Sequence, residues 1–430
     1  MANTILRTGT ANTYDSSLRS ITSRLSSLSA LQENMTSGKK VVRASDDPTN
    51  AATAERALMR INRIATDQRA LESQRNSIVL AESTLGDVTD TMNRFRELVV
   101  NAGNAVNSSA ERRAIANELQ GLREQVLSLA NRTDTNGAPL FSALGSALAP
   151  FVGPAATSPD YTFNGLPGQL ASSDVAIPYS LDGDGAFMHQ PLRDQVFNTS
   201  IVPAGTAHAL STGPFSVSNS ATVSATSAAA SASTGIANSY PSYSLQFTGV
   251  DTSTTPGTTS ATYTVTETPV VSGALGPFTA TGPSNQALTI TGLPGLSFSL
   301  RGTPVVGDKL NISASASVFS VMDNAIRDIG GATNNNTASQ AVSQALYNLD
   351  IGMERISAVR GQAGDLLNRA DRITANQSSR NVQLETDRSR AQDLDMLQAI
   401  SDFNNQQTGY QAALQSYAQV QKLSLFNYIG

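Results

Sequence analysis

The sequence predicts a mainly α fold, a long antiparallel coiled-coil and helical-bundle rod built from both chain ends, with an inserted β-rich middle domain. Two observations carry this prediction. Apolar residues recur at spacings of three and four near both ends of the 430-residue chain, which is the pattern of a coiled-coil seam. Between these blocks Ser, Thr, Ala and Gly dominate, and the only charged residues from 195 to 300 are Asp251 and Glu267.

The apolar stripes at the two ends define the expected contact surface. We predict that residues 1–42 and 392–430 pair as a terminal coiled-coil layer whose stripe, from Tyr14 onward, is a subunit interface. Burying five seam residues contributes about 10 kcal/mol. Ordering about 25 residues costs roughly 1–2 kcal/mol of backbone entropy per residue, which exceeds that gain. The layer is therefore expected to be disordered in the monomer. The predicted interface residues are Leu18, Ile21, Leu25, Leu28, Phe403, Tyr410, Leu414 and Tyr417.

A helix-start motif, Asp46, Asp47 and Pro48, opens the second predicted helix. A carboxylate at the N-cap and proline at the first helical position both favour a start there. The helical pattern then continues to about residue 102, on the order of 80 Å at about 1.5 Å per residue. Its apolar face is expected to consist of Leu85, Val88, Met92, Phe95, Val99 and Ala102.

Two further helical segments complete the predicted bundle, which comprises residues 43–150 and 318–391. Ser108 and Glu111 form a capping-box pattern that opens a helix. Its apolar face is expected to consist of Ile115, Leu119, Leu122, Val126 and Leu129. The helical pattern returns only near residue 339, and the apolar residues there are Val342, Leu346, Leu349, Met353, Ile356, Ala363, Leu367 and Ala370.

The middle segment, residues 151–317, is predicted to be a β-rich, Ser/Thr-rich inserted domain. Residues 263–266 and 296–300 alternate in polarity and lie between Pro and Gly residues, which indicates short strands. The Ser-Ala-Thr run at 220–235 has disorder as its alternative.

No residue pattern points to catalysis, so we expect a protein that is not an enzyme and has no cofactor or metal. Its two histidines, His189 and His208, lack neighbouring metal-ligand or triad patterns. Residues 182–185 begin like a calcium loop, but Arg193 stands where the bidentate Glu belongs, so a tight turn is the preferred interpretation. We interpret Arg112 and Arg113 as part of a solvated helix face, with interface salt bridges as the alternative.

Composition also limits the classes of partner. The net charge of −5 gives no reason to expect nucleic acid or an anionic membrane as a partner. The first residues lack the apolar core of a secretory signal, and no stretch reaches the roughly 18 apolar residues that a membrane span needs. The chain contains no Cys, which fits export in an unfolded state as well as residence in the cytosol.

Several segments together resemble the bacterial flagellin family over residues 1–165 and 320–430. The N-terminal matches include residues 36–42 (Thr-Ser-Gly-Lys-Lys-Val-Val) and 44–48 (Ala-Ser-Asp-Asp-Pro). The C-terminal matches include residues 389–396 and 423–429. The Asp-Asp-Pro form and the chain's last residues are more similar to subunits of the hook–filament junction than to filament flagellins. Further matches are residues 119–123, 129–131, Asp134, Gly137, Phe141, 150–151, 161–165, 359–360, Gly364 and 368–369.

The resemblance implies a structural subunit of the flagellum, secreted by the flagellar type III apparatus and placed outside the cell at the distal end of the hook. It implies self-association in a ring, contacts with a hook-side hook-associated protein and with filament flagellin, and an export chaperone that binds the C-terminal helix. Filament flagellin itself, or another coiled-coil protein exported by a type III route, remains the alternative.

Overall fold

The computed structural model describes residues 10–429, apart from 157–158, 205–208, 237–238, 254–255, 274 and 285. The chain divides into two compact units, one made of residues up to Arg69 with residues from Ile373, and the other of Ala70–Arg372. Each unit is described by itself.

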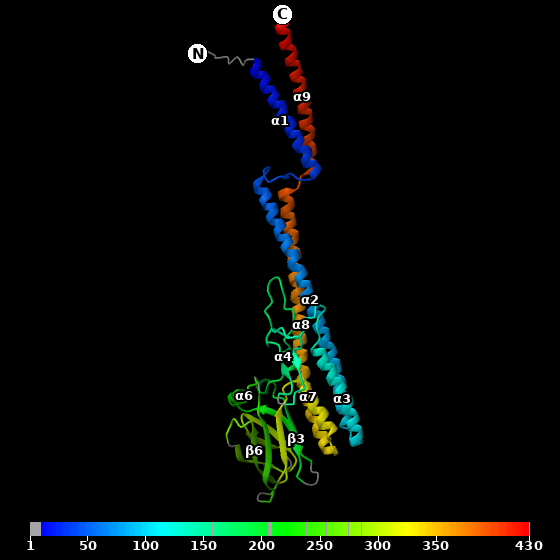
Figure 1. Ribbon diagram of the computed structural model, residues 1–430, viewed down its shortest axis with the longest axis vertical. Helices are drawn as coiled ribbons and strands as arrows, with labels where there is room; N and C mark the ends of the chain where they lie inside the picture. Colours follow the sequence, from blue (N-terminus) through cyan, green and yellow to red (C-terminus); the bar gives the residue numbers. More distant parts are fainter. Residues whose placement is uncertain are drawn as a thin grey trace. The chain divides into compact units, whose positions relative to one another are not determined.

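Figure 1 labels most of the elements. The helices are α1 (Thr10–Ser37), α2 (Pro48–Ala102), α3 (Ser109–Ala130), α4 (Gly183–Phe187), α5 (Pro191–Asp194), α6 (Ser220–Thr234), α7 (Val318–Gly330), α8 (Asn335–Gln392) and α9 (Met396–Ile429). The strands are β1 (Phe151–Val152), β2 (Thr162–Phe163), β3 (Phe197–Val202), β4 (Ser211–Val217), β5 (Ser242–Asp251), β6 (Thr258–Thr268), β7 (Leu275–Pro283), β8 (Leu288–Leu293), β9 (Leu296–Arg301) and β10 (Lys309–Ala314). Among the residues described, no helix is both long and apolar enough to span a membrane.

The predicted helix start at Asp47 is confirmed. One carboxylate oxygen of Asp47 accepts hydrogen bonds from the backbone N–H groups of Thr49 (3.0 Å) and Asn50 (2.9 Å), and α2 begins at Pro48. The hydrogen bond from Asn50 holds the pKa of Asp47 below its ordinary value. Asp46 closes the preceding turn by accepting hydrogen bonds from the N–H groups of Val42 and Arg43.

Two short linkers lie side by side in the first unit. The Lys40 N–H donates to the Gln392 carbonyl at 2.8 Å, and the Leu394 N–H donates to the Gly38 carbonyl at 3.0 Å. Gly38 has a φ of +69°, which ends α1 in the left-handed region where glycine is favoured. These two hydrogen bonds tie the end of α1 to the start of α9.

Long helices with apolar faces form the core of the second unit. All six residues predicted for the face of α2, from Leu85 to Ala102, are buried. On α8, residues seven apart are buried in the same way, namely Val342, Leu349, Ile356, Ala363 and Ala370. The heptad spacing therefore identified the buried faces of both helices.

Helix α3 has the predicted capping box but a different buried face. The Ser108 hydroxyl accepts from the Glu111 N–H, and the Glu111 carboxylate accepts from the Ser108 N–H at 2.6 Å. The solvated face assigned to Arg112 was wrong, because its side chain is buried and donates to Asn335. The buried residues of α3 are Arg112, Ala116, Leu119, Arg123, Val126 and Ala130.

An unpredicted helix, α7, carries an aromatic cluster. Phe319 lies 5.2–5.7 Å, between ring centroids, from Phe151, Tyr161 and Phe187. These partners come from the segment between α3 and β3, so that segment packs directly on α7.

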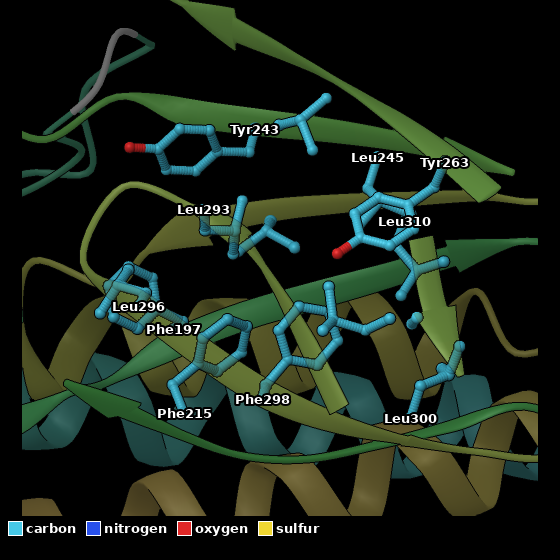
Figure 2. Packing of buried hydrophobic residues seen from close by; sticks show 14 of the residues in the cluster. Phe197, Phe215, Tyr243, Leu245, Tyr263, Leu293, Leu296, Phe298, Leu300 and Leu310 are labelled. Carbon is cyan, nitrogen blue, oxygen red and sulfur yellow. The ribbon is translucent and has the colours of Figure 1, made fainter. Parts of the chain in front are cut away.

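Strands β3 to β10 of the inserted segment form two antiparallel sheets around one apolar core, as Figure 2 shows, whereas β1 and β2 pair separately. The five-stranded sheet has the order β3-β10-β5-β6-β7, and the three-stranded sheet has the order β4-β9-β8. Phe215 lies between Phe197 and Phe298, with 4.8 Å between ring centroids on each side and the rings tilted by 34° and 33°. The two predicted strand fragments lie in β6 and β9.

The disorder alternative for residues 220–235 was wrong, because residues 220–234 form α6. Asn219 caps this helix by accepting from the Thr222 N–H, and Gly235 ends it with a φ of +69°. Val223, Thr226 and Ala230 form its buried face. The 182–185 segment likewise forms a short helix, α4, rather than a simple turn.

Three amide side chains on α8 cover the edges of the two sheets. Gln340 exchanges two hydrogen bonds with Thr212 on β4, through its oxygen at 3.0 Å and its nitrogen at 2.6 Å. Gln344 and Asn348 both donate to the Phe197 carbonyl on β3, at 2.8 and 2.9 Å. Because these residues are four apart, they share one face of the helix and satisfy edge-strand groups that would otherwise be unpaired.

Candidate subunit interface

Helices α1 and α9 form the antiparallel pair that the sequence predicted (Figure 1). The Tyr14 and Tyr417 rings lie 5.5 Å apart between centroids. Arg24 lies against Gly409, and Lys39 forms an antiparallel bridge with Asp393. These pairs advance in opposite directions along the chain, so one face of α1 follows one face of α9 along its length.

Each of the eight predicted interface residues lies on this helix pair, and none is fully buried. Ile21, Leu28, Phe403, Tyr410 and Tyr417 are half-buried. Leu18, Leu25 and Leu414 are 38–51% exposed. Two helices supply too little surface to cover both stripes, so part of the seam faces outward. We predict that neighbouring copies cover this outward part of the seam.

The start of α9 adds apolar residues that the sequence reasoning missed as interface candidates. Met396, Leu397 and Ile400 are exposed, and Leu397 is 85% exposed. Asp395 fixes this turn by accepting from the N–H groups of Leu397 and Gln398. In the sequence, the spacing of these three apolar residues directly after the Asp395 cap indicates an apolar face at the start of this helix.

The helix pair carries little charge. Within α9 the only charged residues are Asp402 and Lys422, and within α1 they are Asp15, Arg19, Arg24 and Glu33. Hydroxyl groups on α1 bond to the same helix, as Thr22 does to the Leu18 carbonyl at 2.8 Å. A hydrogen bond with Tyr14 raises the pKa of Tyr417. Depletion of charge around exposed apolar side chains is the composition of an interface core.

The histidine that the structure describes, His189, is buried beside charged residues of the second unit. Its ring nitrogens have no hydrogen-bond partner among the described residues, and burial lowers its pKa to about 4. Nearby, Asp194 pairs with Arg193 at 2.9 Å and Arg355 at 3.8 Å. His208 lies outside the described residues. The imidazole of His189 is therefore neutral at pH 7.

A second buried polar cluster joins α3, α7 and the segment before β2. Arg123 pairs with Asp323 at 2.9 Å, and the Tyr161 hydroxyl donates to the other oxygen of Asp323 at 2.6 Å. Burial raises the pKa of Asp323 despite the arginine. Since Arg123 and Asp323 are paired, the cluster ties α3 to α7 within one unit.

Two family models match the helical ends of the chain. The bacterial flagellin N-terminal helical region matches residues 10–145, and the bacterial flagellin C-terminal helical region matches residues 346–429. The matched residues include α1 and α9, which carry the exposed stripes, as well as α2 and most of α8.

Individual relatives extend this comparison. Flagellar hook-associated protein 3 of Salmonella typhimurium is 34% identical over 148 residues, which are 34% of this chain and 46% of that protein. The chain thus spans less than half of that relative's length. Phase 1 flagellin of Salmonella naestved is 30% identical over 117 residues, which are 27% of this chain and 23% of that protein.

A solved structure shares the fold. The crystal structure of Xanthomonas campestris FlgL aligns with a TM-score of 0.53 at 24% identity and covers 77% of this chain and 98% of that chain. At this identity the likeness shows the fold alone.

Proposed function

Because this chain belongs to the bacterial flagellin family, we propose that it is a structural subunit of the flagellum that joins the hook to the filament. The relative named for hook association matches over a longer stretch and at higher identity than the flagellin does. That difference supports the junction in preference to the filament. The role is mechanical, carried by repeated contacts between subunits, and not catalytic.

The outward-facing stripe of the α1–α9 pair is the observation that carries this proposal. Leu18, Leu25 and Leu414 remain 38–51% exposed although each helix already contacts the other. Complete burial of such a side chain contributes about 1.5–3 kcal/mol relative to full exposure. Neighbouring subunits that cover the stripe therefore stabilise both themselves and the helix pair.

The eight seam residues, from Leu18 to Tyr417, then form contacts that repeat around a ring of copies. The two faces of this ring would meet a hook-side hook-associated protein and filament flagellin. Before assembly, the stripe on α9 needs shielding, because exposed apolar surface promotes self-association. We assign that shielding to an export chaperone that binds Phe403, Tyr410, Leu414 and Tyr417 as a helix in a groove. The subunit is then secreted and acts outside the cell.

Two measurements test this function. Antibody against this protein should label intact flagella only at the hook–filament boundary, whereas label along the filament would identify a filament flagellin.

The second measurement compares two variants. Leu414→Asp should weaken chaperone binding in a pull-down and abolish incorporation at the hook tip. The matched control is Ser416→Asp, which adds the same charge at an exposed position on another face of α9. Equal effects of both substitutions would refute the shared-stripe argument.

A further inference from the structure

A cavity of about 370 Å³ lies where the edges of the two sheets meet α8. Its size falls within the range of about 300–1,000 Å³ typical of small-molecule sites. Helix α8 contributes one wall, and residues of strands β3, β4 and β9 line the rest. The polar side chains that line it include Gln195, Ser211, Ser299, Arg301, Ser343 and Tyr347.

The walls of this cavity are held by hydrogen bonds that need no ligand. Gln340 is bonded to Thr212, and Gln344 and Asn348 are bonded to the Phe197 carbonyl. Strands β3 and β4 and helix α8 are thereby fixed around the opening. A preformed cavity of this kind binds without paying for its own ordering.

The charge in the cavity is a single positive one. The Arg301 guanidinium has no hydrogen bond or ion pair with any described residue, and no Asp or Glu lines the cavity among the residues described. Between residues 195 and 317 the charged residues are Asp251, Glu267, Arg301, Asp308 and Lys309. Glu267 accepts from the N–H groups of Val271 and Ser272, and Asp308 accepts from those of Ala204 and Val305, so each of these carboxylates has backbone partners.

Neutral polar groups surround the arginine. The hydroxyls of Ser211, Ser299 and Ser343 line the cavity and have no hydrogen-bond partner within the described part of the chain. Gln195 also lines the cavity, and the Tyr347 side chain, which is 41% exposed, lies on the α8 wall. Hydroxyl and amide groups both donate and accept, which suits a ligand that carries several hydroxyls.

From these groups we propose that the cavity binds an acidic sugar, a pyranose that carries a carboxylate. The planar guanidinium of Arg301 matches a carboxylate with two parallel hydrogen bonds. The serine hydroxyls and Gln195 meet the ring hydroxyls. The C–H face of the sugar packs on the Tyr347 ring, whose π face is negative. A phosphate ion would use the arginine but leave the tyrosine and the serine hydroxyls without a role.

Titration of the full-length protein with methyl glucuronide tests this proposal. Saturation-transfer NMR should show magnetisation transferred to the sugar ring, with methyl glucoside binding at least roughly tenfold more weakly because it lacks the charged hydrogen-bond partner. Inorganic phosphate at equal concentration should not displace the glucuronide. Equal binding of the two sugars, or displacement by phosphate, would overturn the assignment.

Variants of the same protein place the ligand. Arg301→Gln should weaken glucuronide binding roughly tenfold or more, while Lys309→Gln, which removes the same charge on β10 of the other sheet, should leave it unchanged. Ser343→Leu provides a second test, since Ser343 is exposed on α8 and leucine favours a helix while filling the opening. Undiminished binding in Ser343→Leu, with its helical circular dichroism intact, would contradict the proposed site.

Discussion

Replacing His189 by glutamine should remove part of the acid sensitivity of the second unit. Burial lowers the pKa of His189 from 6.5 to about 4, and Arg193 and Arg355 oppose protonation further while Asp194 favours it. Because the folded pKa lies below the unfolded one, the unfolded chain binds a proton between these values that the folded chain does not. Stability is therefore complete above about pH 6.5 and is lost as the pH falls toward 4.

The size of this effect follows from the two pKa values. A tenfold change in proton affinity corresponds to about 1.4 kcal/mol, so the fall from 6.5 to about 4 amounts to roughly 3 kcal/mol of unfolding free energy. Between pH 7 and pH 4 the native protein should lose that much more stability than His189→Gln. Acidic groups with lowered pKa values, such as Asp134, contribute in the same direction to both proteins and cancel in the comparison.

Histidine NMR checks the cause directly, because the chain contains only two imidazoles. In a ¹³C-histidine-labelled sample of the His208→Gln variant, His189 gives the only histidine signal. The chemical shift of that signal should titrate near pH 4. Urea unfolding at pH 7 and pH 4 then measures the free-energy difference. A titration midpoint near 6.5, or equal acid sensitivity in His189→Gln, would refute the reasoning.

Three other perturbations follow from the fold. Phe319→Ala removes the ring at the centre of the aromatic cluster and should cost about 3–5 kcal/mol in denaturant unfolding, so a loss below about 1 kcal/mol would contradict its central packing. Asp47→Ala removes the cap of α2 and should cost about 0.5–2 kcal/mol, with faster hydrogen exchange at Thr49 and Asn50 as the local reporter. Deleting residues 197–314 should preserve the helical circular dichroism, because Val196 and Ser315 are hydrogen-bonded at 3.0 Å and a short Gly-Ser linker can join them. Collapse of that helical signal would show that the sheets hold the bundle together.

Local signals explain what the sequence predicted well. The cap at Asp47 and the capping box at Ser108 each lie within three residues of the N–H groups they satisfy. The buried faces of α2 and α8 follow from heptad spacing within one helix. Such features depend on neighbours along the chain, so they can be identified without knowing the fold.

Contacts between residues far apart in the chain explain the features that could not be predicted from the sequence. Arg123, Asp323 and Tyr161 come from three separate segments, and nothing near Arg123 in the sequence distinguishes it from a solvated arginine. The capping signals of α6, Asn219 and Gly235, were present, but its Ser-Ala composition matches disorder equally well. For the terminal helices, periodicity identified the stripes, whereas the fraction left exposed depends on how much surface the partner helix covers.

The central claim is that assembly covers the exposed stripe of the α1–α9 pair, and thiol labelling tests it most directly. The chain has no Cys, so a single introduced thiol reports one position. Leu25→Cys and Val306→Cys replace side chains of similar exposure, 51% and 54%, on α1 and on the β9–β10 loop. The rate of maleimide labelling of Leu25→Cys should be roughly tenfold or more lower in the intact flagellum than in the soluble subunit. The labelling rate of Val306→Cys should be the same in both states. Equal labelling rates at Leu25 in both states would contradict the account.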